Sequence, residues 1–273
     1  MNEYRKPAVA GLFYPANAKQ LSEAVRSLLS VNKPDFKSSK VFGIISPHAG
    51  YIYSGKTASF GFNLLENLNI ENVIIISPSH REYFPGSCIY SGEGYETPLG
   101  NIDIDKELAN KIIQNSKTIF EDVRGHGKEH AIEVQLPFLQ CVLDKFKIVP
   151  IVIGDQSKIY IDELATQVAK AMDDKTIIVA SSDLSHFHTK DSAHQLDSIV
   201  EDSIEKFEYG KLQENLERGI CEACGGGPIV AMMKAADMLK KNRSYVLHRS
   251  DSGDVTGDFN EVVGYLSAVV YGD

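Results

Sequence analysis

The 273-residue sequence lacks the features that would place the protein in a membrane, outside the cell or on nucleic acid. No run reaches the roughly 18 apolar residues that span a bilayer, and the first residues contain no apolar segment of signal-peptide length. The formal net charge is -9, whereas broad contact with nucleic acid or with an anionic membrane needs a basic surface. We therefore expect a cytoplasmic protein that binds neither nucleic acid nor membranes.

Cysteine is scarce as well, with four residues in the chain. Without a secretory signal we expect reduced thiols and no disulfide framework. Cys221 and Cys224 form a C-x-x-C motif, but no second cysteine pair exists to complete a structural zinc site. A helical pattern lies where a thioredoxin-like motif would need a strand. The motif alone therefore assigns no function.

Linkers rich in Pro, Gly or Ser, internal repeats and low-complexity segments are also missing, so we expect one domain over residues 1–273. Continuous apolar runs alternate with helical patterns, as in parallel strands that are covered on both faces. This pattern predicts an α/β fold with a mostly parallel or mixed central sheet and helices on both faces. The expected strands are Val41–Ser46, Asn72–Ser77, Ile148–Ile153, Thr176–Ser181, Tyr245–Arg249 and Val262–Val270. The expected helices are Leu21–Leu29, Thr57–Leu68, Lys106–Gln114, Ile132–Leu143, Ile159–Met172, Ser192–Phe207 and Ile229–Lys241.

Three local features refine this prediction. Ser54 is expected to cap the helix that begins near Thr57, and the helix after His130 should end or kink near Pro137. The long segment of residues 80–100 is either a functional loop or a small β excursion.

Three of the predicted strands deliver a histidine at their ends. The run VFGIIS leads to His48, NVIIIS leads to His80, and TIIVASS leads to Asp183 and His186. Ligands of parallel α/β sheets bind just beyond the carboxyl ends of the strands. We therefore expect these four side chains to meet in one cleft, although a single histidine at a strand end is more often structural.

Asp183 and His186 are three residues apart, so both could face the same side of a turn or helix. A carboxylate beside an imidazole raises its pKa and fixes its orientation, which suits a general acid or base. The competing interpretation is that Asp183 caps the next segment and His186 packs over it.

Cys224 precedes three glycines, Pro228 and an amphipathic helix. Its sulfur should therefore lie near a helix N-terminus, where exposed N–H groups favour the thiolate. Such a sulfur is a candidate nucleophile or soft metal ligand, and a buried, inert cysteine is the alternative. His130, beside Glu129, could line the same cleft or lie on the surface. Tyr51 could form a wall of the cleft or pack beneath it.

Six motifs of this chain, taken in their order and spacing, resemble the Memo family, whose prokaryotic members are called AmmeMemoRadiSam system protein B. The resemblance covers essentially the whole chain. The motifs are RKPAVAGLFYP, PHAGYIYSG, SPSH, EHAIEVQLPFL, SSDLSH and CGGGP.

The resemblance implies a fold like that of LigB-type class III extradiol dioxygenases, which are non-haem iron enzymes. It implies a metal pocket built on His48, His80 and Cys224, with Asp183 and His186 at the acid/base positions and His130 lining the pocket. This chain has Arg81 where the family often has a second histidine, so Arg81 is a candidate contact for an anionic ligand.

Non-haem oxygenases commonly use two histidines and a carboxylate. A thiolate in place of the carboxylate is softer, so iron(II) or copper is the expected cofactor and zinc is also compatible.

Three functions remain open from the sequence. The first is a metal-dependent redox enzyme acting on an unknown small molecule. The second is a non-enzymatic module that binds a peptide or protein in the old catalytic pocket. The third is a metal-free thiol catalyst that uses Cys224, His186 and Asp183. The family name also suggests a pathway shared with an AMMECR-type protein and a radical SAM protein.

Overall fold

The computed structural model describes residues 3–36 and 40–272, and its centre is a mixed sheet. Four adjacent parallel strands form the middle of the sheet, in the order β2-β9-β3-β8. Their bounds are β2 Val41–Ser46, β9 Thr176–Ser181, β3 Asn72–Pro78 and β8 Lys147–Ile153. These four strands agree with the predicted ones to within one residue at each end.

The sheet becomes antiparallel on both sides of this parallel centre. Strand β12 pairs antiparallel with β2, and β10 and β11 pair antiparallel with β12. On the other side β4 is antiparallel to β8 and parallel to β7. Strands β1, β5 and β6 form a separate small sheet. The bounds are β10 His186–His188, β11 Arg243–Asp251, β12 Val262–Tyr271, β4 Ser87–Tyr90, β7 Ile119–Asp122, β1 Tyr4–Arg5, β5 Gly94–Thr97 and β6 Gly100–Asp103.

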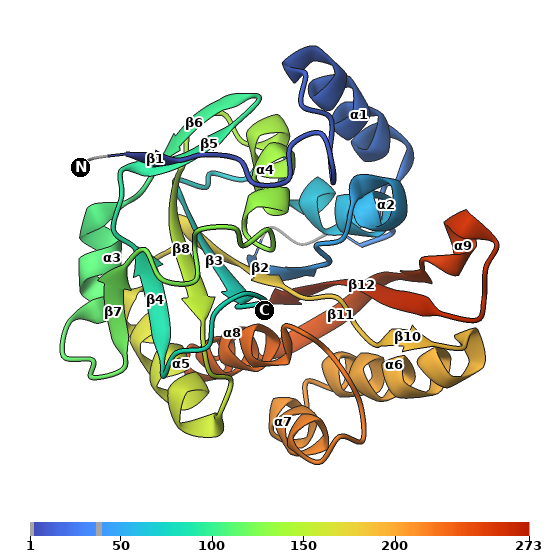
Figure 1. Cartoon of the computed structure of the whole chain (residues 1–273). Coiled ribbons are helices and arrows are strands. Elements are labelled where there is room, and N and C mark those ends of the chain that lie inside the picture. Colours follow the sequence, from blue (N-terminus) through green and yellow to red (C-terminus); the bar gives the residue numbers. More distant parts are fainter. Residues whose placement is uncertain (1–2, 37–39, 273) are drawn as a thin grey trace.

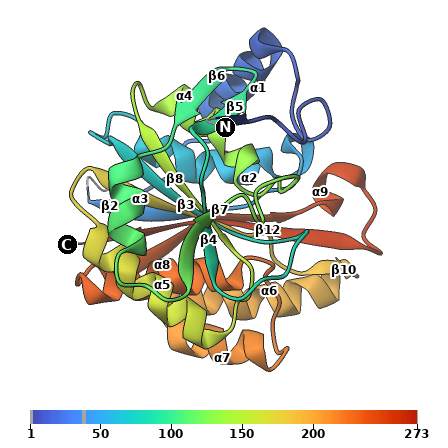
Figure 2. The same ribbon diagram turned by 60° about the vertical axis from the view of Figure 1, so that its left-hand side comes forward.

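Helices cover both faces of the central sheet (Figures 1 and 2). One face carries α1 Ala18–Val31, α2 Tyr51–Phe62, α4 Leu136–Val142 and the short 3-10 helices η1 Asn63–Leu65 and η2 Glu133–Gln135. The other face carries α3 Lys106–Ile113, α5 Lys158–Ala171, α6 Lys190–Glu205, α7 Tyr209–Glu217 and α8 Gly226–Met238. The short helix α9, Gly253–Thr256, lies between β11 and β12. The predicted mixed α/β fold with helices on both faces is confirmed.

The central strands are apolar throughout because successive side chains enter two different cores. In β3, Ile74 and Ile76 pack with α5 and α8 on one face, whereas Val73 and Ile75 pack with α1, α2 and α4 on the other. Alternation of this kind produces a continuous apolar sequence when both faces are covered.

Several predicted helix boundaries are displaced, among them those of α2 and α8, and two predicted local features are wrong. Helix α2 begins at Tyr51 with Gly50 as its N-cap, and Ser54 lies inside the helix, where its hydroxyl donates to the carbonyl of Ala49. Pro137 does not end a helix but occupies the first turn of α4, where its missing N–H is not needed.

The segment of residues 80–100 forms a β excursion, because it supplies β4 and β5. Among the described residues, no helix has both the length and the apolar character needed to cross a bilayer.

Candidate metal centre

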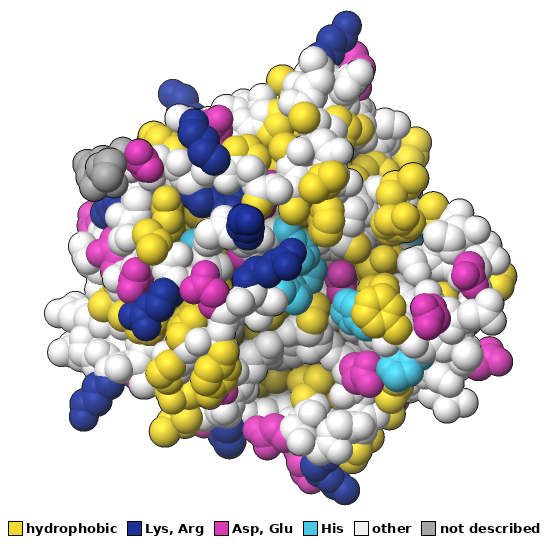
Figure 3. Space-filling model, viewed as in Figure 1, with side chains coloured by type: hydrophobic (Ala, Val, Ile, Leu, Met, Phe, Trp, Pro, Cys, Tyr) yellow, Lys and Arg dark blue, Asp and Glu magenta, His cyan; other side chains and the backbone are white. Residues whose placement is uncertain are grey.

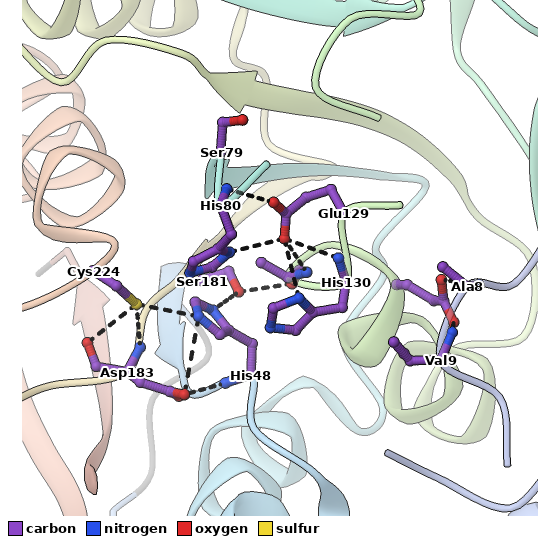
Figure 4. A network of polar contacts seen from close by, with 12 residues as sticks. Ala8, Val9, His48, Ser79, His80, Glu129, His130, Ser181, Asp183 and Cys224 are labelled. Carbon is purple, nitrogen blue, oxygen red and sulfur yellow. Dashed lines mark hydrogen bonds and ion pairs between the residues drawn. The ribbon is translucent and has the colours of Figure 1, made fainter. Parts of the chain in front are cut away.

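The carboxyl ends of β2 and β3 bring two of the predicted histidines to one edge of the sheet, where the loop before α8 adds a sulfur (Figure 4). One ring nitrogen each of His48 and His80 and the Sγ of Cys224 all lie within 4.8 Å of one another. The Nε2 of His48 is 3.1 Å from Sγ, and the two imidazole rings meet edge to face with their centroids 5.0 Å apart.

Ser181, the last residue of β9, determines which nitrogen of His48 carries the proton. Its hydroxyl donates to the carbonyl of Ala131 at 2.7 Å and accepts from the side-chain amide of Gln135 at 2.9 Å. A serine hydroxyl has a single proton to donate. The Nδ1 of His48, 2.8 Å from the same oxygen, must therefore be the donor. Its Nε2 consequently keeps a free lone pair, which points toward Cys224.

Glu129 orients His80 in the same way. Its Oε1 lies 2.9 Å from the Nδ1 of His80, and its Oε2 accepts the backbone N–H of His80 at 2.6 Å. Burial alone would raise the pKa of Glu129, but the hydrogen bonds from His80 and from the Ala131 N–H hold this pKa near 2. An ionised carboxylate only accepts, so Nδ1 of His80 carries the proton and Nε2 has the lone pair. Carboxylate–histidine pairs of this kind are typical of metal sites.

The segment that carries Glu129 is held by the N-terminus of the chain. Arg5 donates to the carbonyls of His126 and Glu129 and forms a buried ion pair with Glu133. Glu129 also accepts the N–H groups of His130 and Ala131 at 2.8 and 3.0 Å. Its Oε1 thus accepts from three N–H donors and its Oε2 from one, so the carboxylate supports the ring and the backbone of His80.

Cys224 lies two residues before α8 and is half-buried. The N–H of Asp183 donates to its sulfur at 3.2 Å. Burial raises the pKa of the Cys224 thiol, and the nearby Asp183 carboxylate adds to this rise. The donors around the sulfur, which include the Gly225 N–H, act in the opposite direction but do not outweigh burial. The expected preference for thiolate is therefore not found in the metal-free chain, where the thiol is protonated.

The structure pairs Asp183 with His48 and not with His186. The Oδ1 of Asp183 accepts the backbone N–H of His48 at 2.7 Å, and Oδ2 lies 4.0 Å from its Nε2. None of the hydrogen bonds among the described residues joins Asp183 to His186. Burial raises the pKa of Asp183 to about 7. The carboxylate–imidazole pair predicted from the three-residue spacing is wrong, because the chain enters the short strand β10 at His186 instead of a helical turn.

Two cavities of about 480 Å³ flank the centre, and His186 lines both. One of the two cavities is also lined by Asp183 and His130. The other is also lined by Cys224 and Cys221. The His130 ring lies 4.9 Å from His80 and 5.4 Å from His48, so His130 lies beside the two histidines. A larger cavity of about 760 Å³ lies at the opposite edge of the sheet, near the first residues of β3 and β8, and contains none of the predicted site residues.

The remaining two predicted site residues lie outside these cavities. Tyr51 is buried at the start of α2, where its hydroxyl donates to the carbonyl of Val134, so it packs beneath the site. Arg81 is exposed and follows His80 directly. It does not line either cavity that flanks the centre.

Sequence reasoning missed the residues that orient the two histidines. Ser181 belongs to the SSD motif and Glu129 precedes His130, so both were visible as neighbours of candidate residues, but nothing local signals which ring each one contacts. Phe13 was missed as well. Its ring packs edge-on against His130 at 4.9 Å, and its carbonyl accepts the first N–H of α2, that of Tyr51.

Comparison with known proteins gives a consistent result over the full length of the chain. The model of the family described as Memo-like protein matches residues 5–269. The MEMO1 family protein TV1383 of Thermoplasma volcanium is 39% identical, and the match covers 97% of both chains. A MEMO1 family protein of Methanobrevibacter smithii is 38% identical over 97% of this chain and 99% of the relative. Among solved structures, the uncharacterized protein JW3007 from Escherichia coli K12 superposes with a TM-score of 0.48 at 14% identity, covering 72% of this chain and 85% of that one.

Proposed function

The chain belongs to the Memo family, and from this premise we propose that it is a metal-dependent redox enzyme whose ion is held by His48, His80 and Cys224. One observation carries the proposal. Each of the two imidazoles is held with its proton on Nδ1. One ring nitrogen of each and the Sγ of Cys224 all lie within 4.8 Å of one another.

The donor set favours some metals over others. Two imidazoles and a sulfur suit iron, copper and zinc, whereas the hard ions magnesium and calcium prefer oxygen ligands. Because metal binding requires the thiolate, loading of the site must release the proton of Cys224. When bound, iron(II) or copper supplies one-electron chemistry that no protein side chain of the site provides.

The protein groups around the site have separate roles in this proposal. The buried carboxyl of Asp183, with a pKa of about 7, holds or releases a proton beside His48 at neutral pH. His186 and His130 face the adjoining cavity, and burial lowers the pKa of both rings, that of His130 to about 4. At neutral pH they are therefore uncharged and can accept a proton or a hydrogen bond from a substrate.

Metal analysis after anaerobic purification tests the proposal directly. We expect the wild-type protein to take up close to one equivalent of iron or copper and Cys224→Ala to lose most of it. Cys221→Ala is the matched control, because this buried neighbour belongs to no potential ligand set of the described residues and should leave uptake unchanged. Negligible metal in the wild type and in Cys224→Ala alike would refute the proposal.

The metal-free thiol mechanism has less support. Burial raises the pKa of Cys224, and Asp183 does not orient His186. A thiol catalyst needs an activated sulfur beside a positioned base. Cys224 in the apo protein should therefore react with a thiol reagent at neutral pH no faster than an unperturbed thiol.

A further inference from the structure

The cavity beside Asp183 has a wall of large apolar side chains that are exposed to solvent. Leu12 is 79% exposed, Ile52 71% and Phe187 71%. Single exposed apolar residues are common on protein surfaces, but a group of them around one opening marks a binding site. These residues come from the N-terminal segment, α2 and β10, and three further members of the wall are Phe13, Tyr53 and Val263. Figure 3 shows hydrophobic side chains gathered next to the histidines on this face.

The backbone of Phe187 is strained in a way that keeps its ring at this opening. Its φ of 61° is in the left-handed region, which is rare for an aromatic residue. The pairing of β10 with β12 shifts register between His186 and His188, so Phe187 forms an irregular step. Strain of this kind is energetically costly and gathers at ligand-binding positions. The exposed ring recovers little of that cost by packing, which points to a ligand as its partner.

The charges of the cavity are all of one sign. Asp183 and Glu261 are its charged lining residues, and no Lys or Arg lines it among the residues that the structure describes. Glu261 is exposed, and it forms none of the hydrogen bonds or ion pairs found among the described residues. The nearby cation Lys190 is already paired with Asp251 and Asp254. A free carboxylate beside apolar walls is complementary to a cation attached to an apolar group.

We propose that this cavity binds a small molecule with an apolar body and a positively charged amino group. The apolar body packs against Phe187, Ile52 and Leu12, and the amino group pairs with Glu261. The volume of about 480 Å³ fits a small molecule. The assignment of this molecule as substrate rests on the proposed metal-dependent function, whereas its binding does not require the metal.

The chain contains no tryptophan, so Phe187→Trp would introduce a single fluorescent reporter at the opening. We would titrate this variant with phenethylamine, with its anionic counterpart phenylacetate and with ethanolamine, which lacks the apolar body. Phenethylamine should change the emission saturably, at least tenfold more tightly than phenylacetate, and ethanolamine should have no effect below 100-fold higher concentration. Saturation-transfer NMR on the wild-type protein provides the same ranking without any substitution.

Glu261→Gln, examined by the NMR measurement, should weaken phenethylamine binding about fivefold and leave phenylacetate no weaker than before. Glu107→Gln, an exposed glutamate on α3, is the control and should change neither. Equal affinity for amine and carboxylate, or no effect of Glu261→Gln, would overturn the proposal. Repeating the titration on Cys224→Ala separates the amine-binding proposal from the proposed metal site, because amine binding should persist in this variant whether or not the wild type binds metal.

Discussion

The buried carboxylate of Glu133 joins the N-terminal segment to the loop that carries Glu129, so its replacement by glutamine is a strong test of the fold around the site. Glu133 is fully buried and forms an ion pair with Arg5. Its oxygens also accept the backbone N–H of Ala8 at 2.7 Å and the Tyr14 hydroxyl at 2.5 Å. Glutamine preserves the shape but removes the charge and turns one acceptor into a donor.

The size of the effect follows from the burial of the pair. Removing one partner of a buried ion pair typically costs about 3–5 kcal/mol, because the other charge stays buried without compensation. Unfolding entropy scales at roughly 2 cal/mol/K per residue, or about 0.6 kcal/mol/K for a chain of this length. Glu133→Gln should therefore lower Tm by roughly 5–9 °C.

Scanning calorimetry of matched variants measures this change. Glu214→Gln is the control, because its carboxylate is 65% exposed and pairs with Arg218, the C-cap residue of α7. Exposed pairs of this kind contribute less than about 0.5 kcal/mol, so Tm should move by about 1 °C or less. If the two variants shift Tm equally, the ion pair of Glu133 with Arg5 does not hold the N-terminal segment as we argue.

Three further predictions concern single positions. Burial lowers the pKa of His126 to about 3, so the folded state rejects a proton that the unfolded state takes up below pH 6.5. As pH falls from 6 to 4, the free energy of unfolding of the wild type, measured by denaturant titration, should fall by about 1.4 kcal/mol per pH unit more than that of His126→Gln. An equal pH dependence of the two proteins would contradict this. Glu129→Gln removes the negative charge beside the His80 ring and turns one of the two acceptor oxygens that face His80 into a donor. It should weaken metal binding roughly 10–100-fold in competition titrations, while an unchanged affinity would refute the supporting role. In Gly225→Ala the new Cβ would lie 2.1 Å from a backbone oxygen of β9, so metal uptake and Tm should both fall, whereas Gly127→Ala, which points into open space, should change neither.

The parallel centre of the sheet could be predicted from the sequence because its strands are buried on both faces. Such strands are continuous apolar runs, and β2 and β9 were predicted with their observed bounds. Strands β4 and β5 have four residues each and no such run, so local pattern alone could not separate them from a loop. The start of α2 was missed because Gly50 provides no side-chain cap.

The site was predictable to a similar degree. The parallel strands predict that a site lies at the carboxyl edge of the sheet. The positions of His48 and His80 just after two of these strands predict that both belong to that site. The residue that orients each histidine ring cannot be predicted in this way, because it comes from a segment far away in the sequence. Ser181 reaches His48 only because β9 is parallel to β2 in one register, in which Ser46 lies beside Ser181. Sequence spacing shows only which residues are close along the chain. It therefore predicts a pair of Asp183 with His186 and does not reveal the contact of Ser181 with His48.

The distances along the chain between His48 and its partners also determine when the site can form. His48 contacts residues that lie 133, 135 and 176 positions further along the sequence. Contacts of such long range form late in folding. During synthesis, the centre therefore stays open until the segment around Cys224 has left the ribosome. In zinc fingers, ligands that are close in sequence let the metal drive folding. Here the order is reversed, and a finished fold must precede the metal loading that we propose.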